Sequence, residues 1–166
     1  MRTLTPSLLT REAFAPFGNV IEVHPDNTQL AINYGRTTRH HAVAEVATSG
    51  PDDRAILSIF RSEPVSLPFQ LQVMERHPRG SQAFMPLSGA PYLVVVAPAG
   101  DFDAAGLRAF LASGSQGVNY HAGTWHHYSL AMERTSDFLV ADRDGPGNNC
   151  DEINLEPHVM LALGEH

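Results

Sequence analysis

The sequence contains no lysine, so its 11 basic residues are all arginines, and they are scattered rather than clustered. At a formal charge of -7 without a basic patch, the chain offers no surface for nucleic acid or for an anionic membrane. The absence of lysine also excludes Schiff-base chemistry. Cysteine occurs once, as Cys150, which excludes an intrachain disulfide and agrees with a reducing compartment. Its polar, acidic surroundings would raise the thiol pKa and argue against a nucleophilic role.

Long apolar runs are also missing. No stretch approaches the length of a membrane span, and the N-terminus lacks the apolar core and cleavage site of a signal peptide. We therefore expect a cytoplasmic protein without a membrane partner. The length of 166 residues suits a single domain, 1–166, with a sizeable core.

Proline and glycine recur as punctuation between short apolar runs, which is typical of a mainly β protein. One helix is predicted over Phe102–Ala112, with Asp101 as its cap, and a shorter helical turn over Arg11–Ala15, stopped by Pro16. Residues 157–166 are expected to form a loosely held tail. The predicted strands are Ile56–Arg61, Phe69–His77, Tyr92–Ala97, Val118–His121, Trp125–Met132 and Asp137–Asp142.

Strand alternation indicates where a site would lie. In the strand that ends at His77, the odd positions from Phe69 onward share one face, which begins apolar and ends in Glu75 and His77. The same reasoning turns His126 to one face of its strand and Trp125 and His127 to the other. A lone histidine is more often a buried residue bonded to backbone, but two strands that each bring a histidine to an apolar face favour a ligand pocket.

Two segments resemble the metal-binding motifs of cupins. The first is Glu75-x-His77-x4-Gln82-x6-Gly89, and the second is His121-x-Gly123-x2-His126. Longer phrases resemble the ureidoglycolate lyase family, formerly called ureidoglycolate hydrolases, over most of residues 4 to 152. They are Leu9-Thr-Arg-Glu-Ala-Phe-Ala-Pro-Phe-Gly18, Val20-Ile-Glu22, Ile32-Asn-x-Gly35, Glu75-Arg-His-Pro-x-Gly-Ser-Gln-Ala-Phe84, Asn119-Tyr-His-x-Gly-Thr-Trp-His-His127, and Phe138-Leu-Val-x-Asp-Arg143 followed by Asn149-Cys150.

The resemblance implies a cupin-like β-barrel, usually a homodimer, that cleaves (S)-ureidoglycolate to glyoxylate and urea in allantoin degradation. Departures from the cupin pattern bear on the metal, because Glu75 stands where a metal-binding cupin has its first histidine and Gln82 where it has glutamate. The enzyme therefore needs no cofactor, or it binds a divalent ion weakly. Nickel is the metal associated with the family, and the ligands would be Glu75, His77, Gln82 and His126.

Cleavage of such a substrate needs a base for its hydroxyl proton and an acid for the departing nitrogen. We expect Glu75, His77 and His126 to transfer these protons, with the division between acid and base left open. The substrate carboxylate favours a guanidinium. Arg61 and Arg143 are the preferred candidates, ahead of Arg76 and Arg39. Neutral donors suited to the urea group are Asn33, Gln82, Asn119 and Tyr120.

Two other interpretations remain open. A metal-dependent cupin oxygenase or isomerase would need stoichiometric metal and lose activity with chelators. A non-catalytic module that binds small acids would leave ureidoglycolate intact, although an anionic Glu75 in the pocket would repel its ligand.

Overall fold

Strands dominate the computed structural model, which describes residues 1–164. The helical elements are short: α1 (Arg11–Phe14), η1 (Asn33–Gly35) and η2 (Ala104–Gly106). The mainly β fold expected from the sequence is therefore confirmed. No helix in the described part of the chain is both long and apolar enough to cross a membrane.

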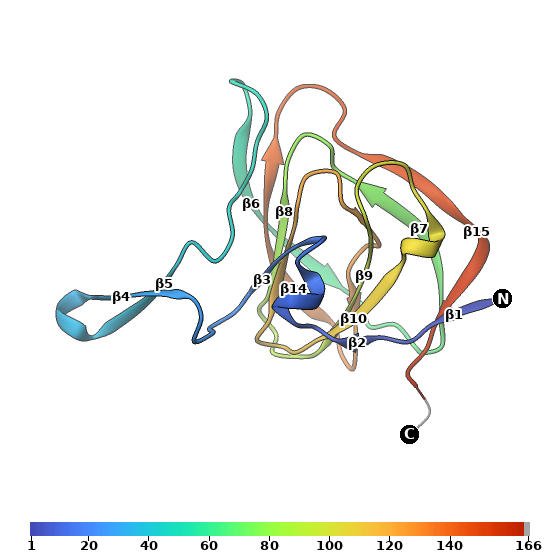
Figure 1. Cartoon of the computed structure of the whole chain (residues 1–166), viewed down its shortest axis with the longest axis horizontal. Coiled ribbons are helices and arrows are strands. Elements are labelled where there is room, and N and C mark those ends of the chain that lie inside the picture. Colours follow the sequence, from blue (N-terminus) through green and yellow to red (C-terminus); the bar gives the residue numbers. More distant parts are fainter. Residues whose placement is uncertain (165–166) are drawn as a thin grey trace.

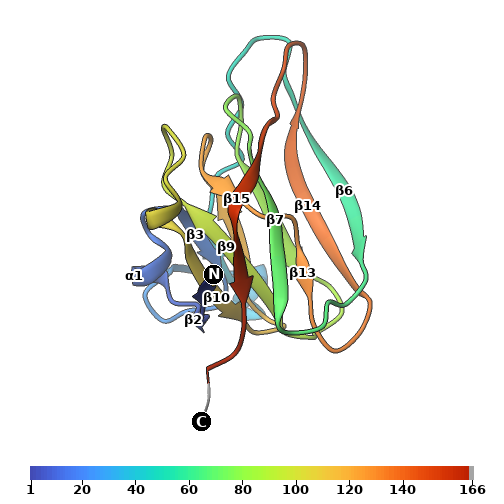
Figure 2. The same ribbon diagram turned by 90° about the vertical axis from the view of Figure 1, so that its right-hand side faces the viewer.

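Two large sheets and one separate hairpin make up the fold (Figure 1). Figure 2 shows β7 and β15 nearest the viewer, between β9 and β10 on one side and β6 and β14 on the other. The eight-stranded sheet contains, in spatial order, β1 (Arg2–Leu4), β15 (Asp151–Leu161), β7 (Phe69–Arg76), β12 (Trp125–His126), β9 (Tyr92–Ala97), β10 (Arg108–Ala112) and β2 (Ser7–Leu8), with β13 (Leu130–Ala131) also paired to β9. The five-stranded sheet contains β3 (Gly18–Ile21), β11 (Gly117–Tyr120), β8 (Gln82–Pro86), β14 (Ser136–Asp144) and β6 (Arg54–Ser62). The hairpin consists of β4 (Thr28–Ile32) and β5 (Thr37–His41).

Two apolar clusters lie on the two faces of the eight-stranded sheet. The inner core lies between the sheets and joins Val94 and Val96 of β9 to Phe84, Val118 and Phe138 of the five-stranded sheet. The outer core lies on the opposite face and takes the alternate β9 residues Leu93, Val95 and Ala97. A strand buried on both faces reads as a continuous apolar run, as β9 does. The two facing sheets form the barrel that the cupin resemblance predicted.

The predicted helix over Phe102–Ala112 is wrong. The segment contains one short turn, η2, which Asp103 caps through a bond from the Ala105 amide to its Oδ1 at 2.9 Å, and then becomes strand β10. Phe110 of β10 packs in the inner core and Ala109 in the outer core. The apolar stripe that indicated a helix therefore belongs to a strand buried on both faces. The shorter turn at Arg11 is confirmed as α1, and the Thr10 side chain caps it.

Two strand predictions also need correction. Trp125–Met132 is not one strand but the short strands β12 and β13 with three residues between them. In β7 the alternation breaks, because Leu71 and Met74 both pack in the outer core. The pairing of β15 with β7 shifts register opposite this point, between Asn154 and Val159. The expectation of one shared face is thus wrong for Phe69 and Leu71, and Glu75 faces away from Met74 toward the barrel interior.

The predicted loose tail is wrong over residues 157–161. These residues form the end of β15, where Val159 and Leu161 pair with β7 and also with β1. Both side chains are buried in the outer core of their own chain, so they do not need a neighbouring subunit. The prediction for residues 165 and 166 lies outside the described residues.

Replacing Leu161 by alanine tests this correction. Leu161 is 0% exposed and Leu163 is 52% exposed. Deleting a fully buried leucine side chain typically costs about 2–5 kcal/mol, whereas surface substitutions usually stay within ~0.5 kcal/mol. We expect Leu161→Ala to lower the free energy of unfolding by that larger amount and Leu163→Ala to leave it nearly unchanged, as measured by urea denaturation. Equal urea-denaturation midpoints for the two variants would support the original prediction of a loosely held tail.

Candidate active site

Cross-strand register gathers polar side chains at one end of the barrel. Glu75 of β7 pairs directly with His126 on one side and with Glu152 on the other. In the facing sheet, Gln82 of β8 pairs with Tyr120 on one side and Asp142 on the other. Directly paired residues lie on the same face of a sheet.

The two rows of polar residues face each other across the barrel. Tyr120 belongs to the inner core, and its ring stacks on the imidazole of His126 with centroids 4.2 Å apart and planes inclined by 2°. Gln82 shares the inner face with Tyr120 and donates from Nε2 to Asp142 Oδ2 at 3.1 Å. The two rows therefore enclose one polar region inside the barrel, between β7 and β12 of one sheet and β8, β11 and β14 of the other.

His77 is oriented by the loop that precedes β15. Its Nδ1 lies 2.7 Å from the carbonyl oxygen of Asn149. A carbonyl only accepts, so Nδ1 carries a proton, and Nε2 is the nitrogen that has a lone pair when the ring is neutral. The Asn149 side chain in turn accepts from the Arg79 amide at 2.7 Å, which fixes this loop against the turn after His77. The His77 Nε2 atom is buried and has no hydrogen-bond partner in the described chain.

His126 is held in the same tautomer but is buried more deeply. Its Nδ1 lies 3.2 Å from the His127 carbonyl oxygen and 3.8 Å from Glu75 Oε1, while the buried Nε2 has no partner within residues 1–164. Burial, reinforced by the charge of His77, lowers the pKa of His126 to about 3. The imidazole is therefore neutral near pH 7.

Glu75 is the more accessible member of the group, since its side chain is 26% exposed. Burial raises the pKa of Glu75 above its ordinary value, although the charge of His77 lowers it in part. The thiol of Cys150 lies 3.8 Å from Glu75 Oε2. The environment therefore favours the protonated carboxyl more than water does.

These side chains also fit a metal ion. One ligand atom from each of Glu75, His77 and His126 lies within 4.8 Å of the other two. Both imidazoles present an unpartnered Nε2, and the buried Gln82 Oε1 likewise has no partner among the described residues. Two nitrogens with a carboxylate and an amide oxygen suit a divalent transition metal.

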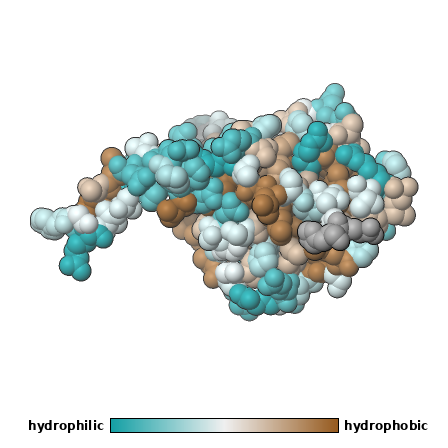
Figure 3. All heavy atoms as spheres, turned by 60° about the horizontal axis from the view of Figure 1, so that its bottom comes forward, coloured by the Kyte–Doolittle hydropathy of each residue, from teal (hydrophilic) through white to brown (hydrophobic). Residues whose placement is uncertain are grey.

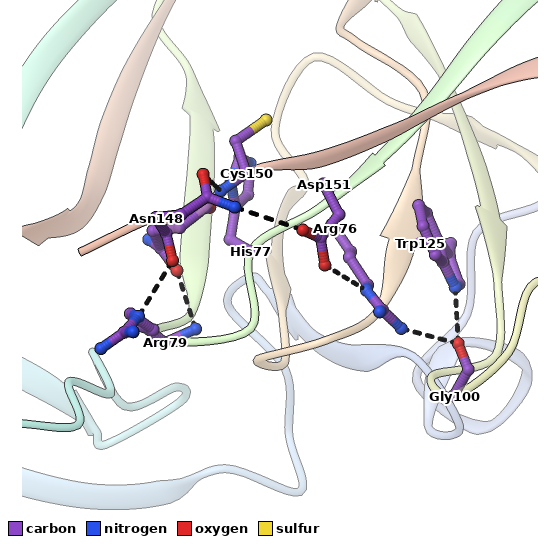
Figure 4. A network of polar contacts seen from close by, with 9 residues as sticks. Arg76, His77, Arg79, Gly100, Trp125, Asn148, Cys150 and Asp151 are labelled. Carbon is purple, nitrogen blue, oxygen red and sulfur yellow. Dashed lines mark hydrogen bonds and ion pairs between the residues drawn. The ribbon is translucent and has the colours of Figure 1, made fainter.

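A separate network of polar contacts links the end of β7 to β12 and to the start of β15 (Figure 4). Arg76 points away from His77, donates to Asp151 Oδ2 at 2.9 Å and to the Gly100 carbonyl at 2.8 Å, and lies over the Trp125 ring at 4.6 Å. Trp125 Nε1 donates to the same carbonyl at 2.9 Å. Arg76 is thus committed to structure, as its place between Glu75 and His77 indicated.

The structure does not bring four of the predicted substrate-binding residues to this cluster. Arg61 faces away from Phe60, whose ring packs on Phe84, and donates to Asp137 at 2.8 and 3.0 Å. Asn33 lies at the exposed hairpin tip and donates to Thr37 Oγ1. Asn119 lies on the opposite face of β11 from Tyr120 and donates to Asn19 Oδ1 at 3.1 Å.

Arg143, the fourth, forms a buried ion pair with Asp53, with Nη2 2.7 Å from Oδ1. Its guanidinium, through this hydrogen bond, holds the pKa of Asp53 well below the usual range. A guanidinium already paired with a buried carboxylate is not free for a substrate.

Comparison with known proteins shows the family of this chain. The family model described as ureidoglycolate lyase matches residues 1–162. The chain belongs to the ureidoglycolate lyase family. Ureidoglycolate lyases of Pseudomonas syringae pv. tomato and Pseudomonas putida are 55% and 53% identical to it, over 98% and 100% of this chain and 96% and 99% of theirs. A dTDP sugar isomerase from Desulfovibrio desulfuricans G20 aligns with a TM-score of 0.49 and 11% identity over 86% of this chain and 88% of its own, a likeness too weak to add to the argument.

The resemblance to the ureidoglycolate lyase family that the sequence indicated is therefore confirmed. The sequence analysis missed Asp142, the hydrogen-bond partner of Gln82, and Asn149, the partner of His77. Asp142 had a readable signal, because Phe138, Val140 and Asp142 alternate along β14 and the first two pack in the inner core. Asn149 offered no such signal in the sequence, because it is its backbone carbonyl that accepts the hydrogen bond from His77.

Proposed function

We propose that this chain cleaves (S)-ureidoglycolate to glyoxylate and urea, as a carbon–nitrogen lyase of class EC 4.3.2.3, with Glu75, His77 and His126 around the reacting atoms. The observation that carries the proposal for these residues is a half-buried imidazole, His77, and a buried one, His126, each with an unpartnered Nε2, next to a carboxyl group with a raised pKa; one ring nitrogen of each histidine and one Glu75 oxygen lie within 4.8 Å of one another. A base and an acid within one small volume are what elimination of urea requires.

The chemistry assigns different roles to the three groups. His77 Nε2 takes the hydroxyl proton of the substrate, the oxygen electrons form the aldehyde carbonyl, and the carbon–nitrogen bond breaks. Glu75, in its protonated form, gives a proton to the departing nitrogen, so that urea leaves as a neutral molecule. His126, with a pKa near 3, is a weak base, and its Nε2 accepts a hydrogen bond that orients the substrate.

A second proposal uses the same atoms as metal ligands. Glu75, His77 and His126, with Gln82, would hold a divalent ion such as nickel, which supplies Lewis-acid polarisation of a substrate oxygen when bound. The chain's own contribution would then be to orient the two imidazoles through the Asn149 and His127 carbonyl oxygens.

Release of urea and glyoxylate from racemic ureidoglycolate tests both proposals. Chelator-treated protein is assayed with and without added nickel or manganese, and spontaneous decay is subtracted. Full activity without metal supports proton transfer by the side chains, and activity only with metal supports their role as ligands. Absence of both products under every condition would overturn the proposed function.

A further inference from the structure

The active site carries acidic groups but no available cation for an anionic substrate. Its inner face presents Glu75 and Asp142, and Glu152 pairs with Glu75 at the rim. A guanidinium is the side chain best suited to bind a substrate carboxylate, through two parallel hydrogen bonds. The chain has no lysine, so arginines are its only side chains that carry a permanent positive charge.

Almost every arginine is already committed. Within residues 1–164, all arginine side chains except those of Arg36 and Arg39 make a hydrogen bond or ion pair. The committed residues are Arg2, Arg11, Arg54, Arg61, Arg76, Arg79, Arg108, Arg134 and Arg143. The two uncommitted side chains both lie on the β4–β5 hairpin, residues 28–41, which we call the arm.

The arm stands clear of the rest of the molecule. Every residue of β4 is exposed, as is every residue of β5 except the half-buried His40. Figure 1 shows the arm projecting from the body on the side away from β7 and β15, and Figure 3 shows hydrophobic and hydrophilic residues interspersed along it. An isolated two-stranded hairpin is at best marginally stable in water. The arm therefore needs a surface to lie on.

The tip of the arm is a tight turn with left-handed backbone. Asn33, Tyr34 and Gly35 have φ values of 54°, 58° and 80°. Left-handed backbone at a non-glycine residue such as Tyr34 is uncommon and energetically unfavourable. The Tyr34 side chain is nonetheless fully exposed in the single chain. Arg36 directly follows this turn.

The charge of the arm fits an acidic partner such as a second copy of the chain. Residues 28–41 contain Arg36, Arg39, His40 and His41 and no acidic residue, whereas the whole chain has a formal charge of -7. The outer face of the five-stranded sheet offers a flat apolar surface for the same partner, since Leu57 and Ile59 of β6 are 71% and 57% exposed. An exposed arm and an apolar face on one chain suit the self-complementary contact of a two-fold dimer.

We propose that two copies of this chain form a dimer in which the arm of each copy brings Arg36 and Arg39 to the active site of the other, where they bind the substrate carboxylate. The inference rests on the proposed function, because it assumes an anionic substrate. The arm points away from the strands that carry Glu75 and His77 of its own chain, so it supplies these arginines in trans.

The double variant Arg36→Ala/Arg39→Ala is the first test. Losing charge-assisted hydrogen bonds to the carboxylate should lower kcat/KM about 10- to 100-fold, mainly through KM. Arg108→Ala, which removes an exposed arginine at the start of β10 that donates to the Leu107 carbonyl, is the matched control and should retain wild-type kcat/KM. Unchanged kcat/KM in the double variant of an active enzyme would overturn the inference and leave the proposed function standing.

Subunit complementation separates action in trans from action within one chain. The arm variant and His126→Ala are co-expressed with different tags, and the heterodimer is purified. If the arm acts in trans, the arm-variant copy keeps an intact site and receives an intact arm, so the heterodimer should recover about half the wild-type turnover per dimer. No recovery above the two parent variants would show that the arm serves its own chain and would overturn the proposal.

Two readouts do not depend on turnover. Light scattering of wild-type protein should give the mass of a dimer, and a monomer would contradict the proposal outright. Calorimetric titration with glyoxylate should show binding by wild-type protein and at least tenfold weaker binding by Arg36→Ala/Arg39→Ala. Equal affinities, or no binding by the wild type, would overturn the arm's role even if the enzyme acted on another substrate.

Discussion

Replacing His126 by alanine should lower kcat about 100-fold, because the substrate loses the hydrogen bond that orients it, while the same replacement at His127 should leave kcat within a few-fold of wild type. The two residues are adjacent and equally buried, but they face opposite sides of the sheet. His126 stacks on Tyr120 beside Glu75 and His77, whereas His127 packs edge-on against Phe69 near the outer core. Steady-state urea release, measured for both variants, gives kcat and KM.

The pair separates a chemical role from a structural one. Both alanine variants create a cavity of the same size and should lose stability in urea denaturation. Only the His126 variant removes an Nε2 atom from the cluster. Comparable losses of kcat in the two variants would indicate that His126 supports the fold rather than the reaction. His77→Ala should lower kcat by about 10²–10⁴-fold, because its Nε2 is the proposed base.

The sequence was most informative where strands have one buried face. The alternation that indicates Glu75, His77 and His126 depends on the period of two along a strand and on apolar neighbours, although in β7 this period is interrupted between Leu71 and Met74, which both pack in the outer core. The structure places these three residues within reach of one another. The same alternation in β14 carries from Phe138 and Val140 to Asp142, so this residue is also predictable from its strand.

Where a strand is buried on both faces, apolar and polar residues no longer alternate along it. Phe110 and Ala109 of β10 both face apolar cores, and the run that contains them was misread as a helix. The end of β15 was misread as a tail because Glu156, Pro157 and His158 interrupt its apolar pattern where pairing with β7 is irregular.

The two preferred arginine candidates, Arg61 and Arg143, lie away from the cluster for another reason. The partners of Arg61 and Arg143 are Asp137 and Asp53, which lie 76 and 90 residues away in the sequence. Nothing in a single sequence tells which aspartate will meet which arginine after folding. Only the complete set of pairings singled out Arg36 and Arg39 as uncommitted.

Acid should destabilise this protein strongly because two buried histidines must gain protons when it unfolds. Burial lowers the pKa of His126 to about 3 and that of His127 to about 4 in the folded chain, whereas an unfolded histidine titrates near its ordinary value of 6.5. Below pH 6.5 the unfolded state therefore binds more protons than the folded state, and stability falls as the pH falls. Each histidine contributes about 1 kcal/mol per pH unit, so the free energy of unfolding should drop by roughly 3–5 kcal/mol between pH 6 and pH 4.

The ionisable groups around His126 change the size of this loss of stability at acid pH but not its direction. The pKa of about 3 for His126 already includes the effect of a positive charge on His77. Glu75, whose folded pKa is raised by burial, offsets part of the loss because its protonation favours the folded state as the pH falls. Urea denaturation of chelator-treated protein across this pH range gives the slope free of competition from a bound ion. His127→Gln should reduce the slope by about one proton, and His158→Gln, at an exposed position, should leave it unchanged. The contradicting result is a wild-type free energy of unfolding that does not change from pH 6 to pH 4. It would mean that the two imidazoles are protonated as readily in the folded chain as in the unfolded one. The proposed mechanism would then also be contradicted, because it requires a neutral His126 that accepts a hydrogen bond.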